Sequence, residues 1–380
     1  GRRRGSMSGR RPIHLMLTGG GTGGHLFPAI AAAEAFCAEY PGTQVLFVGT
    51  KRKMDAVSLG NHGFTGCSVD CYGLKGKNPI ELVRALLVLP LSFVQAIGHI
   101  RRFRPDVVLG VGGYVTGPVV AAARTLGIPT VIHEQNSVPG LANRKLAAIV
   151  DRICLSLPDS GGFFPQRKCV LTGNPVRQGI VDLAGHRRSG SAPGLTVAVL
   201  GGSQGAHALN MLVRDAFCGA AGTRLHGIRL IHQTGDKDEA EIAASYRQAE
   251  VPAEVAAFFR DMPGVYGRAD LVVSRAGATT LSELAVLGLP AILVPYPFAA
   301  DNHQEKNAGH YVRGGGALMV REKDLTADLL AEQIGRLATD LAGRETMSAA
   351  MRQAALPEAA QAIVAVCRQL ISGRQAGTGL

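Results

Sequence analysis

The chain has 380 residues, of which 46% are hydrophobic and 18% charged, a composition that is typical of a folded protein and excludes a disordered one. This length exceeds one ordinary hydrophobic core and predicts two domains. The formal net charge of +11 favours anionic partners, such as acidic lipids or phosphorylated substrates. Because the sequence has no RNA-binding, zinc-finger or helix-turn-helix signature, we expect no nucleic-acid partner.

Residues 1–6 precede Met7 and resemble the remnant of an expression tag, so we expect the native chain to start at Met7. The sequence has no apolar run of about 18 residues, and we expect no transmembrane helix. The seven cysteines lack the paired spacing of a zinc site and are expected to be reduced, as in a cytoplasmic protein.

Short β-branched runs alternate with helical patterns along most of the chain. In the first half we expect strands at Ile13–Leu17, Gln44–Val48, Asp106–Leu109, Thr130–Ile132 and Arg152–Leu155, and helices at Ala29–Glu39 and Thr116–Leu126. In the second half we expect strands at Leu195–Leu200, Gly227–His232, Val255–Phe258, Leu271–Val273, Ala291–Val294 and Ala317–Val320, and helices at Ala206–Phe217, Thr279–Leu287 and Gln304–Val312. Such alternation predicts α/β domains with parallel sheets that are covered on both faces.

A break between Gly173 and Gly194 divides the chain into two halves. Each half opens with an apolar strand, a glycine-rich loop and the start of a helix. We therefore predict two Rossmann-like, doubly wound domains that face each other across a cleft, the first over 7–177 and the second over 178–355. A last helix at about 356–372 is expected to pack back on the N-terminal domain.

The first glycine loop contains Gly19, Gly21 and Gly24, which fit the G-x-G-x-x-G pattern of dinucleotide-binding proteins. Backbone N–H groups in such a loop, with the positive end of the next helix, suit negatively charged oxygen atoms. A dehydrogenase would place an acidic residue at the end of the second strand, but residues 49–52 read Gly-Thr-Lys-Arg. The loop therefore favours phosphate binding, and a dehydrogenase remains the alternative.

The second glycine loop, Gly201–Gly205, contains Ser203 and Gln204, whose side chains can donate to phosphate oxygens. Two such loops on opposing domains suggest that one binds a donor diphosphate and that the other approaches an acceptor. One or two glycines in each loop are instead expected to let strand and helix pack closely.

A third loop precedes the helix that Thr279 or Thr280 can cap. Glu283 lies one turn inside this helix and has no basic residue three or four positions away. Its carboxylate can accept hydrogen bonds from both hydroxyls of a ribose, or it can be a solvated residue favoured by the helix dipole. The residues alone leave both interpretations open.

Two polar clusters directly follow predicted strands, residues 133–136 in the first half and residues 301–307 in the second. Open α/β sheets bind ligands at the carboxyl ends of their strands, so both clusters are candidate binding sites. Hydrogen bonds that stabilise the loops are the alternative role for each of these side chains.

The segment Pro79–Arg104 is rich in leucine and valine, is interrupted by Pro90, and ends with Arg101 and Arg102. An apolar stretch bordered by basic residues is typical of a segment that lies on an anionic lipid surface. Packing against the sheet is the alternative, and we expect it for part of the apolar side chains.

Seven motifs in this order resemble those of the MurG family of N-acetylglucosaminyltransferases, which have the GT-B fold. They are residues 20–25, 112–118, 133–136, 173–177, 201–206, 276–283 and 301–307. Each motif alone is shared with other GT-B transferases, but the colinear set, from about Met7 to about Arg368, is specific. The resemblance implies transfer of N-acetylglucosamine from UDP to lipid I, the lipid-linked N-acetylmuramyl precursor of peptidoglycan, which yields lipid II.

The resemblance also implies roles for individual residues. UDP-N-acetylglucosamine would lie mainly on the C-terminal domain, with Glu283 at the ribose, the backbone near Phe259 at the uracil, and Ser203 and its loop, with Gln204, at the phosphates. His303 or Gln304 would recognise sugar hydroxyls. The other implied binding residues are Ala278, Thr279, Thr280, Leu281 and Ser282 beside the nucleotide, and Thr22, Gly23, Gly24, Asn136 and Arg177 on the N-terminal side of the cleft.

The expected chemistry is an inverting displacement, in which the C4 hydroxyl of the N-acetylmuramyl unit attacks the anomeric carbon from the face opposite UDP. A hydroxyl is a weak nucleophile, so a general base is expected. His25 is the first candidate, although orienting its loop is its alternative role; Tyr114, His133 and Glu134 are the reserve candidates. Backbone N–H dipoles and Arg177 would stabilise the leaving diphosphate. We expect metal-independent transfer and no other cofactor.

The implied partners are UDP-N-acetylglucosamine, lipid I and the anionic surface of the bacterial inner membrane, to whose cytoplasmic face the protein would bind peripherally. A cell-wall synthesis complex is a further candidate partner. The alternatives are a UDP-N-acetylglucosamine 2-epimerase, a transferase that uses another lipid acceptor, and a non-catalytic nucleotide-sugar-binding protein. We see no carboxylate cluster of the kind that an epimerase needs, and the presence of His25 and Glu283 argues against a catalytically silent protein.

Overall fold

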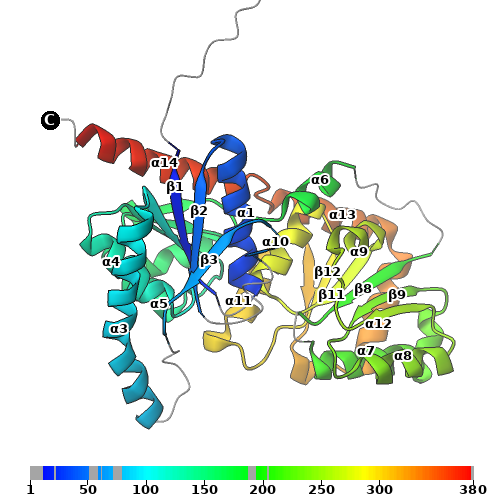
Figure 1. Cartoon of the computed structure of the whole chain (residues 1–380). Coiled ribbons are helices and arrows are strands. Elements are labelled where there is room, and N and C mark those ends of the chain that lie inside the picture. Colours follow the sequence, from blue (N-terminus) through cyan, green and yellow to red (C-terminus); the bar gives the residue numbers. More distant parts are fainter. Residues whose placement is uncertain are drawn as a thin grey trace, which may run out of the picture.

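The computed structural model describes residues 12–20, 23–50, 59–60, 62–71, 79–186, 194–202 and 205–377. Two α/β domains lie next to each other, each built around its own parallel sheet (Figure 1). The two Rossmann-like domains that the sequence predicts are therefore confirmed.

The N-terminal sheet has seven parallel strands in the order β3-β2-β1-β4-β5-β6-β7. Its strands are β1 (His14–Thr18), β2 (Gln44–Gly49), β3 (Thr65–Ser68), β4 (Val107–Gly110), β5 (Thr130–Glu134), β6 (Arg152–Leu155) and β7 (Cys169–Leu171). The helices beside them are α1 (Gly23–Glu39), α3 (Pro79–Phe103), α4 (Thr116–Thr125), α5 (Leu141–Leu146) and α14 (Ala359–Gly377). The sequence did not predict β3 and β7, which are short strands on the two edges of the sheet.

The C-terminal sheet has six parallel strands in the order β10-β9-β8-β11-β12-β13. Its strands are β8 (Thr196–Leu200), β9 (Arg229–Gln233), β10 (Ala253–Ala256), β11 (Leu271–Ser274), β12 (Ala291–Leu293) and β13 (Ala317–Met319). The helices beside them are α6 (Gln178–His186), α7 (His207–Cys218), α8 (Glu239–Gln248), α9 (Met262–Arg268), α10 (Ala278–Leu287), α11 (His303–Arg313), α12 (Ala327–Thr339) and α13 (Leu341–Gln353).

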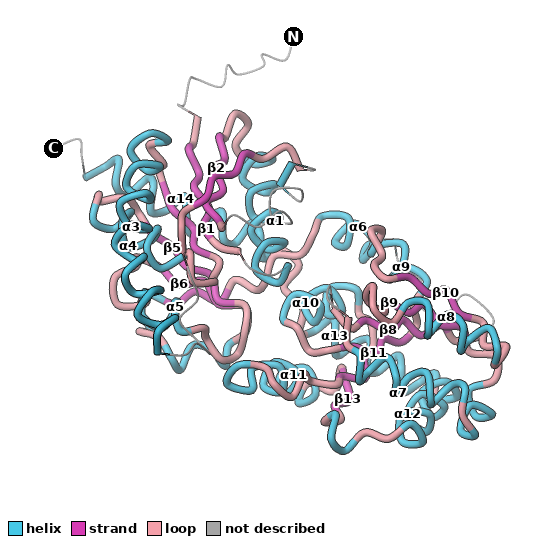
Figure 2. Tube along the Cα trace, turned by 60° about the horizontal axis from the view of Figure 1, so that its bottom comes forward, coloured by secondary structure: helices cyan, strands magenta, loops and turns pink. Residues whose placement is uncertain are grey.

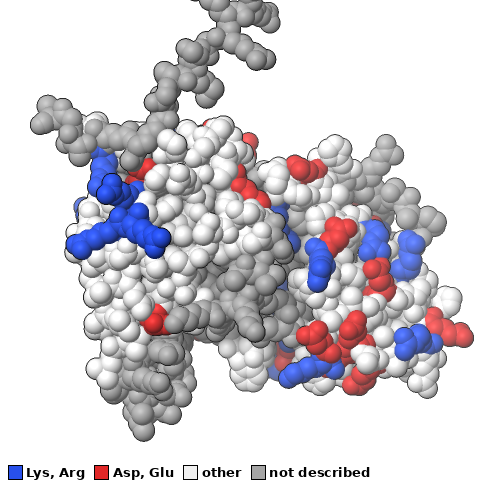
Figure 3. Space-filling view, viewed as in Figure 1, with Lys and Arg blue, Asp and Glu red and all other residues white. Residues whose placement is uncertain are grey.

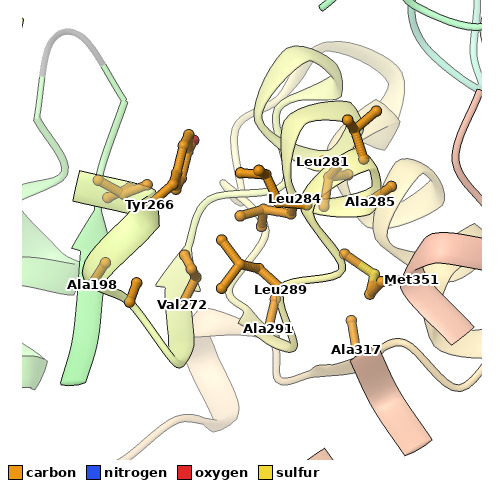
Figure 4. Close-up of a cluster of buried hydrophobic side chains, with 14 of the residues drawn as sticks. Ala198, Tyr266, Val272, Leu281, Leu284, Ala285, Leu289, Ala291, Ala317 and Met351 are labelled. Atoms are coloured by element: carbon orange, nitrogen blue, oxygen red, sulfur yellow. The ribbon is translucent and has the colours of Figure 1, made fainter. Parts of the chain in front are cut away.

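Apolar side chains cover both faces of each sheet, as parallel strands require. In the C-terminal domain, one cluster joins Val272 of β11 and Ala291 of β12 to Leu284 of α10, Tyr266 of α9 and Met351 of α13 (Figure 4). All of these side chains are buried. This packing fixes the start of α10 relative to the strand ends, which is where the predicted nucleotide site lies.

The chain crosses between the domains twice. The first crossing runs through Gly173, whose φ of +85° favours glycine, and the second runs through Leu356 into α14. A Cβ atom on Gly173 would lie 2.6 Å from the Cβ of Leu356, so the two crossing segments are in contact. The predicted helix at about 356–372 corresponds to α14, which packs against α1 through Ile363 and Val364. The domain boundaries at 177 and 355 stay a prediction.

Each sheet reverses its winding at one point, between β1 and β4 in the first domain and between β8 and β11 in the second. A crevice opens outside the carboxyl ends of the strands at such a switch point. The tube view of Figure 2 shows α1, α10 and α11 where the two domains meet, and α1 contacts α10 directly. The two switch points therefore border one interdomain cleft.

Candidate active site

A pocket of about 380 Å³ lies in the cleft and is lined by both domains. The N-terminal domain and the first crossing contribute Gly24, His25, Phe27, Gln135, Asn136 and Arg177. The C-terminal domain contributes Leu200, Gly202, Gln233, Phe258, Met262, Tyr266, Gly277, Ala278, Thr279, Thr280, Glu283, His303 and Gln304.

The structure brings ten of the sequence-predicted site residues together in this pocket, and they are Gly24, His25, Asn136, Arg177, Ala278, Thr279, Thr280, Glu283, His303 and Gln304. Leu281 is instead buried in the core, and the Ser282 hydroxyl donates to the Ala278 carbonyl within α10. Phe259 is not part of the lining, but Phe258 beside it is. Gly23 begins α1. Thr22, Ser203 and Gln204 lie outside the described residues.

His25 lies in the first turn of α1 and packs against the loop that follows β4. A Cβ atom on Gly112 would lie 2.8 Å from Cδ2 and 3.0 Å from Nε2 of His25, so only glycine leaves room for the imidazole. Burial, and secondarily the nearby His303, lowers the pKa of His25 to about 4. The ring is therefore neutral at pH 7, which is the state in which it can accept a proton.

His133, one of the reserve candidates for the base, is fully buried at the end of β5. Its Nδ1 accepts a hydrogen bond from the Gln135 amide at 3.1 Å, and its Nε2 donates to the Gly173 carbonyl at 3.1 Å. Burial lowers its pKa to about 4. Because both ring nitrogens have protein partners, the geometry favours a positioning role: His133 ties β5 to the first crossing segment.

Glu134, a second reserve candidate, is also buried and organises the loop that follows β5. Its Oε1 accepts from the Asn136 N–H at 3.0 Å, and its Oε2 accepts from the Asn143 amide at 2.8 Å and the Gly140 N–H at 3.1 Å. Burial raises the pKa of Glu134, although these hydrogen bonds oppose the effect. Tyr114, the third reserve candidate, is not in the pocket lining, and its carbonyl accepts from the Cys71 thiol.

Glu283 has partners that the sequence did not reveal. Arg177 donates to its Oε1 from Nε at 3.1 Å and from Nη2 at 2.7 Å, and the Tyr266 hydroxyl donates to its Oε2 at 2.9 Å. The Arg177 guanidinium also lies 5.0 Å from the centre of the Phe27 ring of α1. Arg177 thus connects α10 of the C-terminal domain to α1 of the N-terminal domain in the lining of the pocket.

Gln304 faces the pocket in a fixed orientation. Its Oε1 accepts from the backbone N–H groups of Ala276 at 3.1 Å and Tyr296 at 2.9 Å. With the oxygen held by two loops of its own domain, Gln304 can offer a ligand only N–H donors, which suit sugar hydroxyl oxygens. His303 beside it donates from Nδ1 to the Ala300 carbonyl.

Asn307 is a buried residue of α11 and lies three residues after Gln304. Its Oδ1 accepts from the Ser137 N–H at 2.8 Å, and its Nδ2 donates to Asn136 Oδ1 at 3.0 Å and to the Ala276 carbonyl at 3.3 Å. It therefore bridges both domains. The sequence placed Asn307 in a motif, residues 301–307, but predicted no role for it. Its spacing of three residues from Gln304 on α11 could have indicated that the two side chains share one face of the helix.

The first turn of α10 lies at the pocket. The helix begins at Ala278 after Gly277, and of the described side chains none caps its first N–H groups. Such a helix end attracts negatively charged oxygen. The Thr279 hydroxyl donates to the Gly24 carbonyl of the opposite domain at 3.2 Å, so α10 and α1 meet beside the same space. Within the described part of the chain, no three His, Cys, Asp or Glu side chains gather as a metal site.

The stability of the chain at acidic pH tests the buried state of His133. Its pKa is about 6.5 when unfolded and about 4 when folded, so between these values the unfolded chain binds one more proton. The contribution of His133 to the free energy of unfolding is therefore fully present above pH 6.5. It decreases by about 1.4 kcal/mol per pH unit as the pH falls from 6.5 towards 4.

His133→Gln keeps one donor and one acceptor but cannot titrate. We expect urea unfolding of this variant, measured from pH 7 to pH 5, to show a smaller acid loss than the parent by roughly that slope. His226→Gln, at an exposed position, is the control and should keep the parental slope. Equal slopes for all three proteins would show that His133 is already protonated, or accessible, in the folded chain.

Comparisons with known proteins address the family. The glycosyltransferase family 28 N-terminal domain matches residues 15–155, and the family 28 C-terminal domain matches residues 196–363. The UDP-N-acetylglucosamine–N-acetylmuramyl-(pentapeptide) pyrophosphoryl-undecaprenol N-acetylglucosamine transferase of Desulfotalea psychrophila is 60% identical over 366 residues, which are 96% of this chain and 99% of that protein.

A solved structure also supports membership of this family. The crystal structure of MurG from Acinetobacter baumannii is similar with a TM-score of 0.74 and 31% identity, covering 94% of this chain and 100% of that one. A UDP-N-acetylglucosamine 2-epimerase from Neisseria meningitidis, bound to UDP-N-acetylglucosamine, has a TM-score of 0.67 but 13% identity over 94% of this chain and 100% of that one. The second likeness concerns the fold alone.

Proposed function

The chain belongs to the MurG family, within glycosyltransferase family 28, and from this membership we infer its reaction. It transfers N-acetylglucosamine from UDP-N-acetylglucosamine to lipid I, the undecaprenyl-diphosphate-linked N-acetylmuramyl-pentapeptide, and so makes lipid II for peptidoglycan. The observation that carries this inference is 60% identity over 366 residues, which are 96% of this chain. The epimerase alternative is not favoured, because its structural likeness extends only to the fold.

The donor is proposed to lie along the C-terminal wall of the pocket. Phe258, on the segment after β10, lines the wall where the uracil is proposed to bind, and Glu283 lines it from α10. The uncapped start of α10 supplies N–H groups for the diphosphate, and the N–H donors of Gln304 suit the sugar. In this arrangement the anomeric carbon faces the N-terminal domain.

Binding of the ribose requires a rearrangement at Glu283. Arg177 supplies two hydrogen bonds to Oε1 and Tyr266 supplies one to Oε2, so the carboxylate has few acceptor sites left for a diol. The ribose hydroxyls are proposed to replace Arg177. The released guanidinium then lies between Glu283 and the start of α10, where it can bind the diphosphate and stabilise the charge that develops on the leaving group.

The acceptor hydroxyl is proposed to approach from the N-terminal domain, past His25. The displacement inverts the anomeric carbon: the bond from the C4 oxygen forms as the bond to UDP breaks, and the hydroxyl proton passes to the base. His25 is neutral and lines the pocket, whereas His133 and Glu134 are not among the lining residues. We therefore place the base at His25.

An assay with labelled UDP-N-acetylglucosamine and a short-chain lipid I analogue tests the reaction directly. We expect release of UDP and formation of a disaccharide product only when the acceptor is present, with turnover retained in EDTA. Release of UDP, or epimerised sugar, without the acceptor would support an epimerase instead.

Replacement of His25 tests the base. His25→Ala should lower kcat by about 10²-fold or more, because a positioned base typically contributes that much, while the Kd for UDP stays within about threefold. The exposed His226→Ala is the matched control. Since burial holds the pKa near 4, kcat/KM of the parent should fall only as the pH approaches that value. Undiminished turnover of His25→Ala would remove it from the mechanism.

We also propose that the protein binds peripherally to the cytoplasmic face of the inner membrane through α3. Leu87, Leu91 and Val94 recur along one face of this helix and are 73%, 51% and 64% exposed. Arg101 and Arg102 at its end are exposed, and basic side chains gather on this side of the N-terminal domain (Figure 3). In the described residues, no helix combines the length and the apolar character that a membrane span requires. The more N-terminal side chains of the predicted segment lie outside the described residues.

Vesicle flotation tests this surface. The parent should float with vesicles that contain anionic phosphatidylglycerol and detach as salt rises, because both apolar contact and charge contribute. The triple variant Leu87→Glu, Leu91→Glu and Val94→Glu should lose most of this binding yet retain its affinity for UDP. Leu341→Glu, at an exposed leucine of the C-terminal domain, is the control. Equal flotation of the triple variant would contradict the proposed surface.

A further inference from the structure

Asn307 of α11 holds segments of both domains, although it does not itself line the pocket. The residue is fully buried, and its side-chain amide makes three hydrogen bonds. Its Oδ1 accepts from the Ser137 N–H, and its Nδ2 donates to Asn136 Oδ1 and to the Ala276 carbonyl. An amide provides the acceptor and the two donors that this set requires. Asn307 therefore acts on a bound ligand through the residues that it holds.

On the C-terminal side, Asn307 helps to fix the start of α10. Ala276 is fully buried and comes just before that helix. Its N–H donates to Gln304 Oε1 at 3.1 Å, and its carbonyl accepts from Asn307 Nδ2 at 3.3 Å, so α11 holds both backbone groups of this residue. The direction in which α10 begins is therefore set by two side chains on one face of α11.

On the N-terminal side, Asn307 reaches the loop that follows β5. Its Nδ2 donates to Asn136, which lines the pocket, and its Oδ1 accepts from the next backbone N–H along the chain. Gln135 of the same loop donates from Nε2 to the Val111 carbonyl at 2.7 Å. Val111 begins the segment against which His25 packs. The loop that Asn307 holds is therefore bonded to the segment that positions the proposed base.

A second contact between the domains on α11 lies in a different environment. Arg313 donates from Nη2 to Asp159 Oδ2 at 2.6 Å, and both residues are exposed. Exposed pairs of this kind contribute little to stability. Neither residue lines the pocket, so this pair joins the domains away from the site, whereas Asn307 bonds one wall directly and fixes the start of α10 in the other.

We propose that Asn307 is a positioning residue that sets the separation between the donor wall and the wall that holds the base. This inference rests on the proposed function, in which the donor lies along the C-terminal wall and the acceptor approaches past His25. Affinity for the donor then depends mainly on one wall. Attack requires the acceptor oxygen and the anomeric carbon to be aligned and close together, and this geometry depends on both walls. Asn307 thereby determines the rate of transfer rather than the binding of the donor.

Steady-state kinetics with UDP-N-acetylglucosamine and the short-chain lipid I analogue test this role in Asn307→Asp. As a carboxylate, the new side chain can still accept from the Ser137 N–H, but it cannot donate to Asn136 or to the Ala276 carbonyl. We expect kcat to fall by about tenfold or more, because small misplacements of reacting groups have large effects on rate. The Kd for UDP, measured by calorimetry, should stay within about threefold, which also shows that the variant is folded.

Arg313→Ala is the matched control, because it breaks the other α11 contact between the domains and changes no residue of the pocket lining. It should keep kcat and the Kd for UDP within about twofold of the parent, as expected for an exposed pair. An equal fall in kcat for Arg313→Ala and Asn307→Asp would show that α11 acts only by joining the domains, and would overturn the specific role of Asn307.

A double-mutant cycle provides a second test that does not depend on Asn307→Asp folding. Asn307→Ala and Asn136→Ala are measured singly and together. If Asn307 acts through Asn136, kcat of the double variant should be at least about threefold higher than the product of the two single effects predicts. Single effects that simply multiply would contradict the proposed connection.

The remaining outcomes separate this role from the proposed function. A loss of UDP affinity as large as the loss of kcat would mean that Asn307 only stabilises the donor wall, and an unchanged kcat in Asn307→Asp would mean that it sets no separation. Either result would overturn its role. A parent protein that forms no disaccharide product from the lipid I analogue would overturn the proposed function itself.

Discussion

Arg177 and Glu283 form the contact on which the arrangement of the cleft depends. Arg177 lies at the end of the first crossing segment, stacks on Phe27 of α1, and donates twice to a carboxylate that is held from its other side by Tyr266. Removing one partner of such a largely buried pair typically costs about 3–5 kcal/mol, because the other charge is left without compensation. The pair is therefore stable until a ligand supplies replacement hydrogen bonds, and this makes it suited to respond to a nucleotide.

The position of the cleft depends on the carboxyl ends of the strands in the two sheets. Their switch points bring the start of α10 and the loop after β5 to one space. Helix α11 then links the two sides, because Gln304 faces the donor wall while Asn307 bonds the N-terminal domain at Ser137 and Asn136. The residue that we propose for sugar recognition, Gln304, and the residue that bonds the opposite domain, Asn307, thus lie three positions apart on a single helix.

The sequence predicted the elements that carry a strong local signal. The buried strands β4 and β8 consist mostly of apolar residues, and β5 has Val131 and Ile132 at its centre; all three were found within one or two residues of their bounds. The edge strands β3 and β7 were missed because they have only four and three residues, which are too few to show a clear period. Glu283 was expected to lack a basic neighbour because Arg177 lies 106 residues away, a distance at which helical spacing carries no information. Gln233, which lines the pocket, was missed for the same reason, since its partners Gly202 and Phe259 lie in loops that follow other strands.

The most direct measurement is a crystal structure of the chain with UDP-N-acetylglucosamine. The account predicts a nucleotide in the interdomain pocket, ribose hydroxyls within hydrogen-bonding distance of Glu283, and the Arg177 guanidinium moved from that carboxylate to the diphosphate. A nucleotide bound outside the cleft, or one bound there while Arg177 keeps both of its bonds to Glu283, would contradict it.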